Sequence, residues 1–93
     1  MLDVPLLIGG QSCPARDGRT FERRNPVTGE VVSRVAAATL QDADAAVAAA
    51  QAAFPTWAAL APNERRTRLL KAGEQLQARS AEFIAAAGET GAM

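Results

Sequence analysis

The sequence of 93 residues contains no histidine and a single cysteine, Cys13. Without histidine, neither a zinc site of the Cys/His type nor a histidine-based acid-base pair can form. A lone cysteine cannot form an internal disulfide, which is typical of a reducing compartment. We therefore expect a cytoplasmic chain that holds no metal.

An excess of charge of either sign is also lacking, because ten Lys and Arg residues balance ten Asp and Glu residues. A balanced chain lacks the long-range attraction that binding to nucleic acid or to an anionic membrane surface needs. No apolar run approaches the roughly 20 residues of a membrane-spanning helix. The first ten residues, MLDVPLLIGG, carry an acidic residue where a signal peptide carries basic ones. We expect neither a nucleic-acid nor a membrane partner.

Large apolar side chains are scarce as well. Hydrophobic residues make up 48% of the chain, but much of this is alanine, and the aromatic residues are three Phe and one Trp. A chain of this length buries only roughly 60% of the surface that its unfolded form exposes. The core that these residues can build by themselves is therefore small.

The first third of the chain has the pattern of strands and turns. The apolar run Leu6–Ile8 is closed by Gly9 and Gly10, and Arg16-Asp17-Gly18 has the composition of a tight turn. These features predict a first hairpin.

A second hairpin is predicted around the stretch NPVTGE, residues 25–30. Pro26 presets the backbone for the first turn position, and Gly29 can take the left-handed conformation that closes a four-residue loop. The flanking segments 20–25 and 30–36 are then the paired strands.

A helical period begins at Thr39. Thr39 can cap a helix, with Asp42 at its third position and Asp44 close behind, and Pro55 is expected to end the helix. Four apolar residues form one stripe that we expect to face a core: Ala43, Val47, Ala50 and Phe54. Because Ala45, Ala48 and Ala52 lie on the opposite side, we expect this helix to be packed on two sides.

Two further helices are predicted. Pro62 suits the first position of a helix over 62–79, in which Leu69, Leu70, Gly73 and Leu76 form the apolar face and Glu64 pairs with Arg68. Ser80 can cap a third helix that contains Phe83, Ile84 and Ala87. The chain is thus predicted to be α+β, with antiparallel hairpins over 1–38 and about three helices over 39–93, all within one small domain.

Several residues could carry chemistry, but each has a simpler interpretation. Cys13 lacks a base that could activate it, so an inert thiol is favoured. Gly9 and Gly10 match neither GxGxxG nor GxxxxGK[ST], so they are interpreted as turn residues. Trp57 is interpreted as a core anchor that joins the first two helices.

The charged clusters also have structural explanations. The run Glu64–Arg68 is the main cationic cluster, and we expect the stems of Arg65 and Arg66 to cover the apolar stripe rather than to bind an anion. The carboxylates have ordinary helical positions: Asp42, Asp44, Glu82 and Glu89. We predict that the chain contains no catalytic, cofactor-binding or metal-binding residue.

A series of short motifs occurs in this order along the chain: Asn25-Pro26-x-Thr28-Gly29-Glu30, the Ala-Val-x-x-Ala pattern from Ala46 to Ala50, Ala53-Phe54 followed by Trp57, Glu64-Arg65-Arg66, Leu69-Leu70 and Glu89-Thr90-Gly91. In their order and spacing, these motifs resemble the N-terminal segment of the NAD(P)-dependent aldehyde dehydrogenases, and the resemblance extends from Leu6 to Gly91. The sequence departs from the family at Ala92-Met93, where a lysine often follows. The segments TFER and AAQAAF are most similar to those of the salicylaldehyde and vanillin dehydrogenases.

This resemblance implies an α/β parent fold in which the chain begins a Rossmann-like coenzyme-binding domain. It implies an oxidoreductase that converts an aldehyde, with a leaning toward an aromatic one, into an acid through a thiohemiacetal and hydride transfer to NAD or NADP. The family's catalytic Cys, general-base Glu, oxyanion-hole Asn and cofactor-contacting residues lie beyond residue 93, and Cys13 does not match the catalytic Cys. The implied partner is the remainder of the fold, and the full-length form is expected to be a homo-oligomer.

Two hypotheses follow. The first is a truncated or partial aldehyde dehydrogenase that is inactive and binds no cofactor as this chain alone. The second is a free-standing helical interaction module without catalytic activity, which uses its exposed apolar faces to bind a partner.

Overall fold

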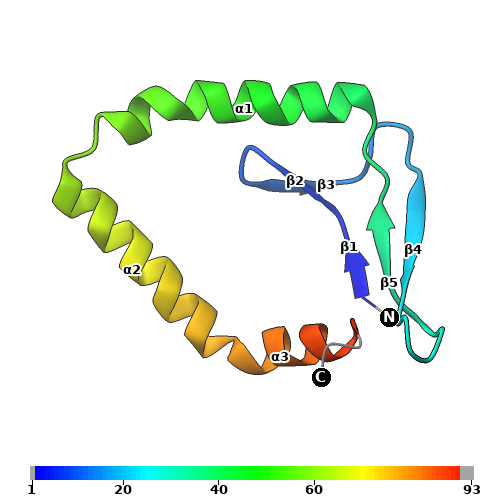
Figure 1. Ribbon diagram of the computed structural model, residues 1–93. Helices are drawn as coiled ribbons and strands as arrows, with labels where there is room; N and C mark the ends of the chain where they lie inside the picture. Colours follow the sequence, from blue (N-terminus) through cyan, green and yellow to red (C-terminus); the bar gives the residue numbers. More distant parts are fainter. Residues whose placement is uncertain (1, 91–93) are drawn as a thin grey trace.

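The computed structural model describes residues 2–90, in which five short strands precede three helices (Figure 1). The elements are β1 (Leu2–Val4), β2 (Leu6–Ile8), β3 (Gln11–Cys13), β4 (Thr20–Arg24), β5 (Val31–Ala36), α1 (Leu40–Ala58), α2 (Pro62–Ala78) and α3 (Ser80–Gly88). The predicted order of strands followed by helices is confirmed. Gly91 and Ala92-Met93, which belong to the sequence pattern given above, lie outside the described residues.

The first hairpin pairs β2 with β3 and is closed by two glycines. Gly9 and Gly10 have φ angles of 60° and 77°, a region that residues with a Cβ rarely adopt. The turn at Arg16-Asp17-Gly18 follows, where the Gly18 N–H donates to the Ala15 carbonyl at 2.9 Å. Both features agree with the sequence-based expectation.

The second hairpin pairs β4 with β5 around the predicted loop. The Asn25 side-chain oxygen accepts hydrogen bonds from the N–H groups of Val27 and Thr28, and Gly29 has a φ of 77°. The Asn25 N–H donates to the Glu30 carbonyl at 2.9 Å, which closes the loop. Asparagine and glycine thus play the local roles that turn chemistry assigns to them.

A parallel strand completes the larger sheet and was not predicted. β1 pairs with β5, so that Asp3 lies opposite Arg34 and the strand order is β1-β5-β4. The expectation of antiparallel hairpins alone was therefore incomplete. A parallel pair has no tight turn to mark it, and three residues are too few to show an alternating pattern.

The capping of α1 is as predicted, but its end is not. Thr39 and Asp42 form a capping box at the N-terminus, whereas the helix continues through Pro55 to Ala58. The expectation that Pro55 ends the helix was wrong. Proline lacks an N–H but keeps its carbonyl, which accepts a hydrogen bond from the Ala59 N–H at 3.1 Å, so one further turn can form.

The face of α1 that contacts the strands also differs from the prediction. α1 packs on β2, and a methyl group at Gly9 would lie 3.8 Å from the Ala49 Cβ. Ala46 and Ala49 are half-buried, but Val47 of the predicted stripe is 67% exposed. Within the described residues, α1 is therefore packed only on the side of Ala46 and Ala49. The predicted second side, Ala45, Ala48 and Ala52, is exposed there.

The junction of α2 and α3 is a single residue, Arg79. Its N–H donates to the carbonyls of Gln75 and Leu76, and its carbonyl accepts from the N–H of Glu82. Ser80 is therefore the first residue of α3 and not its cap, so that prediction was wrong. Arg79, with φ −106° and ψ 20°, is the residue before α3, and no side chain caps this helix.

The described chain is thin and open. Its radius of gyration is 16.7 Å, against about 12 Å for a compact domain of this length, and its extents are 48 × 33 × 16 Å. The three helices run as an arc around the strands, and α3 ends near the end of the sheet from which β1 starts (Figure 1). The accessible surface is 7355 Å², against about 5,100 Å² for a compact monomer of this mass.

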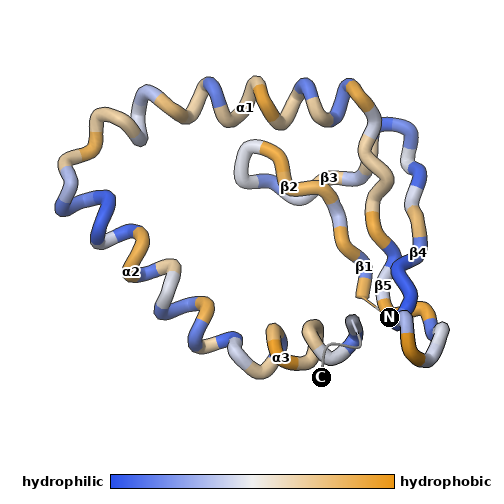
Figure 2. The backbone as a smooth tube through the Cα atoms, in the orientation of Figure 1, coloured by the Kyte–Doolittle hydropathy of each residue, from blue (hydrophilic) through white to orange (hydrophobic). Residues whose placement is uncertain are grey.

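Apolar side chains occupy much of this open surface, and Figure 2 shows apolar segments along all three helices. The fully buried residues in the described part are small or polar: Ala15, Ser33, Ala36 and Asp42. The exposed large apolar side chains are Leu2, Val4, Leu7, Phe21, Val27, Leu40, Val47, Phe54, Trp57, Leu69, Leu70, Leu76, Phe83 and Ile84. The molecule therefore exposes most of its large hydrophobic residues.

Candidate functional site

Asp42 is the most extensively hydrogen-bonded acid in the described residues. Its Oδ2 accepts hydrogen bonds from the N–H of Thr39 at 2.9 Å, from the Thr39 hydroxyl at 3.0 Å and from the N–H of Arg16 at 3.1 Å. The Thr39 backbone bond is the main cause of a pKa below the ordinary value for the Asp42 carboxyl, and the Arg16 backbone bond follows it. Asp42 thus fastens the turn after β3 to the start of α1.

This arrangement is structural. The Asp42 N–H donates to the Thr39 hydroxyl at 3.2 Å and the Asp42 carboxylate accepts from the Thr39 N–H, so the two residues form a capping box at the N-terminus of α1. The bonds of this carboxylate to backbone N–H groups hold it ionised, which suits an anchor and not a proton donor at neutral pH.

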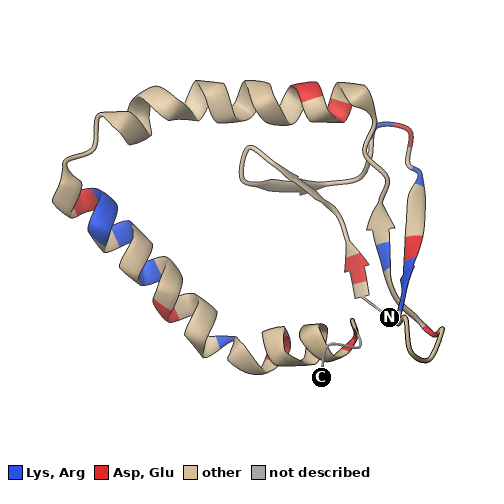
Figure 3. Cartoon of the chain, viewed as in Figure 1, with Lys and Arg blue, Asp and Glu red and all other residues tan. Residues whose placement is uncertain are grey.

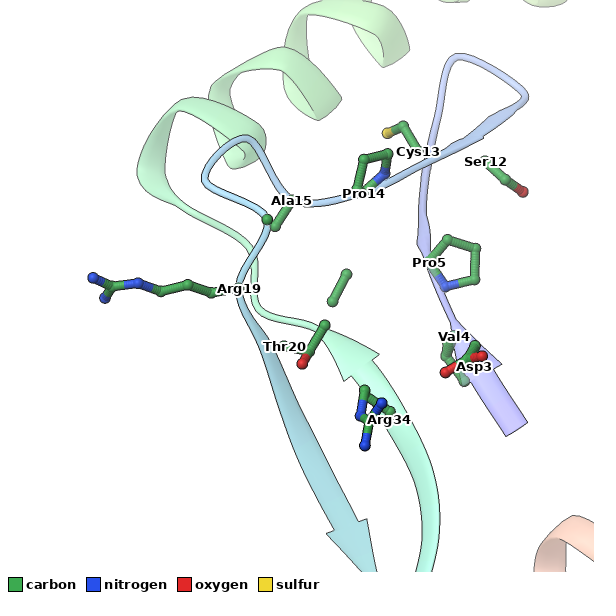
Figure 4. Close-up of a pocket in the computed structure, with 12 residues that line it drawn as sticks. Asp3, Val4, Pro5, Ser12, Cys13, Pro14, Ala15, Arg19, Thr20 and Arg34 are labelled. Carbon is green, nitrogen blue, oxygen red and sulfur yellow. The ribbon is translucent and has the colours of Figure 1, made fainter. Parts of the chain in front are cut away.

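A surface hollow of about 540 Å³ lies between β1, β3 and the β4–β5 hairpin (Figure 4). Its lining includes Cys13, Ser12, Asp3 and Arg34. Cys13 is half-buried there, next to Pro14. No histidine exists in the chain to activate the thiol.

The cationic run lies at the start of α2, where Figure 3 shows it as a blue patch. Arg65 and Arg66 line one shallow hollow with Leu69 and Leu70, as expected for arginine stems that lie along the apolar residues. The predicted pair of Glu64 and Arg68 does not appear among the ion pairs of the described residues. That prediction was wrong, because both side chains extend into solvent at an exposed helix surface.

Trp57 lies at the corner between α1 and α2. It shares the same hollow with Pro62 and Arg65, so its predicted position beside both helices is correct. Its side chain is nevertheless 39% exposed, and it is not a core residue of the described chain. The partner that would bury it is not among residues 2–90.

Glu89 has a role that its position in the sequence did not reveal. Its Oε2 accepts a hydrogen bond from the Arg23 guanidinium at 2.8 Å, and the Arg23 Nε donates to the Ser33 hydroxyl at 3.1 Å. Arg23 is on β4, so this contact joins residues 66 positions apart. No sequence signal marks it, because neither a helical spacing nor a hairpin register relates the two residues.

The other predicted candidates lie apart from one another. Gly9 and Gly10 form the β2–β3 turn, Asp44 is on the first turns of α1, and Glu82 pairs with Arg79 at the start of α3. Residues 2–90 contain no group of three or more His, Cys, Asp or Glu side chains that could hold a metal ion. Among the helices of this range, none combines the length and apolar character that crossing a bilayer requires.

Comparison with known proteins gives a consistent result. Residues 13–92 match the sequence model of the aldehyde dehydrogenase family. The chain is 91% identical to a vanillin dehydrogenase of Pseudomonas fluorescens over 93 residues, which are 100% of this chain and 19% of that protein. It is 42% identical to a salicylaldehyde dehydrogenase of Pseudomonas putida over 83 residues, which are 89% of this chain and 17% of that protein.

The fold agrees with a solved structure. The crystal structure of a salicylaldehyde dehydrogenase from Pseudomonas putida G7 complexed with salicylaldehyde matches with a TM-score of 0.86 at 38% sequence identity. The match covers 90% of this chain and 17% of that one. The chain thus spans about a fifth of the relatives that it matches.

Members of the family use NAD or NADP, and the described residues do not fit such a dinucleotide. At the N-terminus of α1 the Thr39 side chain already accepts from the Asp42 N–H, and α2 begins with Pro62, which offers no N–H. The two adjacent glycines lie in a hairpin turn and do not open a helix. The comparisons confirm the resemblance that the motifs indicated, and they confirm that the chain matches only part of its relatives. The chain belongs to the aldehyde dehydrogenase family.

Proposed function

We propose that this chain is a structural, non-catalytic part of an aldehyde dehydrogenase whose complete polypeptide oxidises an aldehyde to a carboxylic acid with NAD or NADP. The observation that carries this proposal is the open surface, which exceeds that of a compact monomer by about two-fifths. Exposed side chains such as Leu76 and Phe83 are residue types that normally lie inside a fold. The remainder of the fold is the partner proposed to cover them.

The chain alone is proposed to be catalytically inactive and to bind no cofactor. Its one thiol, Cys13, has no histidine to activate it, the N-terminus of α1 is capped by the Thr39 side chain, and α2 begins with a proline. None of the residues 1–93 is therefore assigned a catalytic, cofactor-binding or metal-binding role.

The proposed substrate of the complete protein is an aromatic aldehyde. Support comes from the identity of 91% to a vanillin dehydrogenase and of 42% to a salicylaldehyde dehydrogenase. We also propose that the complete protein is a cytoplasmic homo-oligomer, which rests on the family resemblance and on the single cysteine.

A free-standing interaction module is the second candidate. The observation that favours it is an apolar groove along α2 and α3, lined by residues that include Gly73, Leu76, Phe83 and Ile84. This candidate requires the isolated chain to be a compact monomer or a defined oligomer in sedimentation experiments. An aggregated or loosely packed chain counts against it.

Fragment complementation tests the main proposal. Residues 1–93 are co-expressed with the Pseudomonas fluorescens vanillin dehydrogenase from which the matching 19% has been deleted. We expect the two pieces to form a complex that produces NADH from vanillin and NAD⁺, while neither piece does so alone. NADH production by the 93-residue chain alone would overturn the proposal, and failure of the pieces to associate would count against the proposed partner.

A covalent graft supplies the matched control. In this graft, residues 1–93 replace the corresponding segment of the same relative, so that association is no longer required. We expect the graft to be active. An inactive but folded graft would show that this segment cannot support the proposed activity.

A further inference from the structure

The arm formed by α2 and α3 has few contacts with the strands. The extensive contacts between elements join β4 with β5, β1 with β5, β2 with β3, and α1 with β2. Neither α2 nor α3 takes part in any of these. The arm is attached to the rest of the described chain at its α1 corner, and its far end meets the sheet through Arg23 and Glu89.

Arg23 is held in position on the sheet side. Its Nε donates to the hydroxyl of Ser33, which lies on β5 directly opposite it in the register and is almost fully buried. The guanidinium group then reaches Glu89 through a separate nitrogen at 2.8 Å. A planar guanidinium group can hold both partners at once, which a lysine ammonium group cannot do with the same geometry.

On the helix side, Glu89 lies where a carboxylate is locally unfavourable. It caps the C-terminus of α3, and an acidic residue at that end faces the negative pole of the helix dipole. The last turn of α3 contains no basic residue of its own. Arg23, which lies on a strand, supplies this cation. The contact therefore compensates the charge of Glu89 and also stabilises the C-terminus of α3.

We propose that Arg23 and Glu89 form an electrostatic clasp that couples the α3 end of the arm to the β4–β5 hairpin and opens at high ionic strength. Both side chains are 37% exposed, so salt can screen their attraction. When the clasp is closed, the arm and the sheet move as one unit. When it opens, the end of α3 and the β4–β5 hairpin each become more mobile. This inference does not depend on the proposed enzymatic activity.

Hydrogen–deuterium exchange in the graft tests the clasp. We expect E89Q to accelerate amide exchange in β4 and β5, and R23Q to accelerate it in the last turn of α3, each roughly two- to fivefold. The charge swap R23E with E89R should return both rates toward those of the unmodified graft. Raising the NaCl concentration to about 0.5 M should accelerate exchange in the unmodified graft and leave E89Q unchanged.

The matched control is E82Q, which breaks the pair of Arg79 and Glu82 at the start of α3. We expect this variant to leave exchange in β4 and β5 unchanged. The proposal is overturned if E89Q leaves the β4–β5 rates unaltered, or if E82Q has the same effect as E89Q. Because Glu89 is at an exposed helix end, E89Q decides the question even if R23Q prevents folding.

Discussion

At the scale of the residue, the best-determined features are those in which one side chain satisfies several backbone groups. Asp42 joins the turn before β4 to the start of α1, and Asn25 organises the β4–β5 loop. Both side chains replace hydrogen bonds that the backbone cannot make within a helix or a sheet. Their loss should therefore destabilise the segments that they connect.

The pH dependence of stability should reveal Asp42. Its pKa is lower in the folded state than the ordinary value of 3.8, so its contribution to stability is fully present above that value. The contribution is lost as the pH falls from about 4 through the lowered folded pKa. We expect the difference in urea midpoint between the graft and its Asp42→Asn variant to be constant from pH 7 to 5 and to shrink below pH 4. A difference that grows on acidification would contradict this assignment.

Gly29 gives a second test at this scale. Its φ of 77° is unfavourable for residues with a Cβ, and a Cβ there would meet no atom within 4 Å. The cost of Gly29→Ala in the graft should thus be that of the backbone alone, roughly 1–2 kcal/mol in the free energy of unfolding. Gly29→Asn should cost less, because asparagine tolerates the left-handed region. Equal costs would indicate that the loop changes its conformation.

At the scale of the element, local chemistry determined what could be predicted. The two hairpins and the cap of α1 follow from glycines, Asn25 and Thr39, which act within a few residues of themselves. The end of α1 could not be predicted from Pro55. Whether a helix continues past a proline depends on whether the residues after it form backbone hydrogen bonds, as the Ala59 N–H does with the Pro55 carbonyl. The parallel partner of β5 could not be found, because its pairing depends on residues about 30 positions away.

Pro55 leads to a prediction about α1. Its ring removes the hydrogen bond that another residue would donate to the carbonyl of Gln51. We expect Pro55→Ala to stabilise the graft by roughly 1–2 kcal/mol, which is the helix penalty of proline less its benefit in the unfolded chain. Urea unfolding measures the change. A loss of stability would mean that the proline ring makes contacts outside the described chain that outweigh the missing bond.

At the scale of the whole molecule, the extensive contact between a helix and a strand within residues 2–90 is that of α1 with β2, through Ala46 and Ala49. Periodicity predicted apolar faces on α1 and α2, but it could not show which neighbour covers each face. Val47, Leu76 and Phe83 are exposed because residues 2–90 provide no element to cover them. The ion pair of Arg23 with Glu89 could not be predicted for a similar reason, because the two residues lie 66 positions apart in the sequence.

Leu76 distinguishes a covered from an uncovered stripe. It is 55% exposed in this chain, so Leu76→Ala should change the stability of the described residues little. In the graft, where we propose that the rest of the fold covers α2, the same substitution should cost roughly 2–5 kcal/mol in the free energy of unfolding. A cost near zero in the graft would show that this face remains open to solvent.

The central claim is that residues 1–93 were selected to pack against a scaffold that they do not contain. The most direct measurement is a two-dimensional amide NMR spectrum of the isolated chain, with binding of a hydrophobic dye measured on the same sample. We expect poorly dispersed or broadened resonances together with strong dye binding. Well-dispersed resonances, a cooperative thermal transition and no dye binding would contradict the claim.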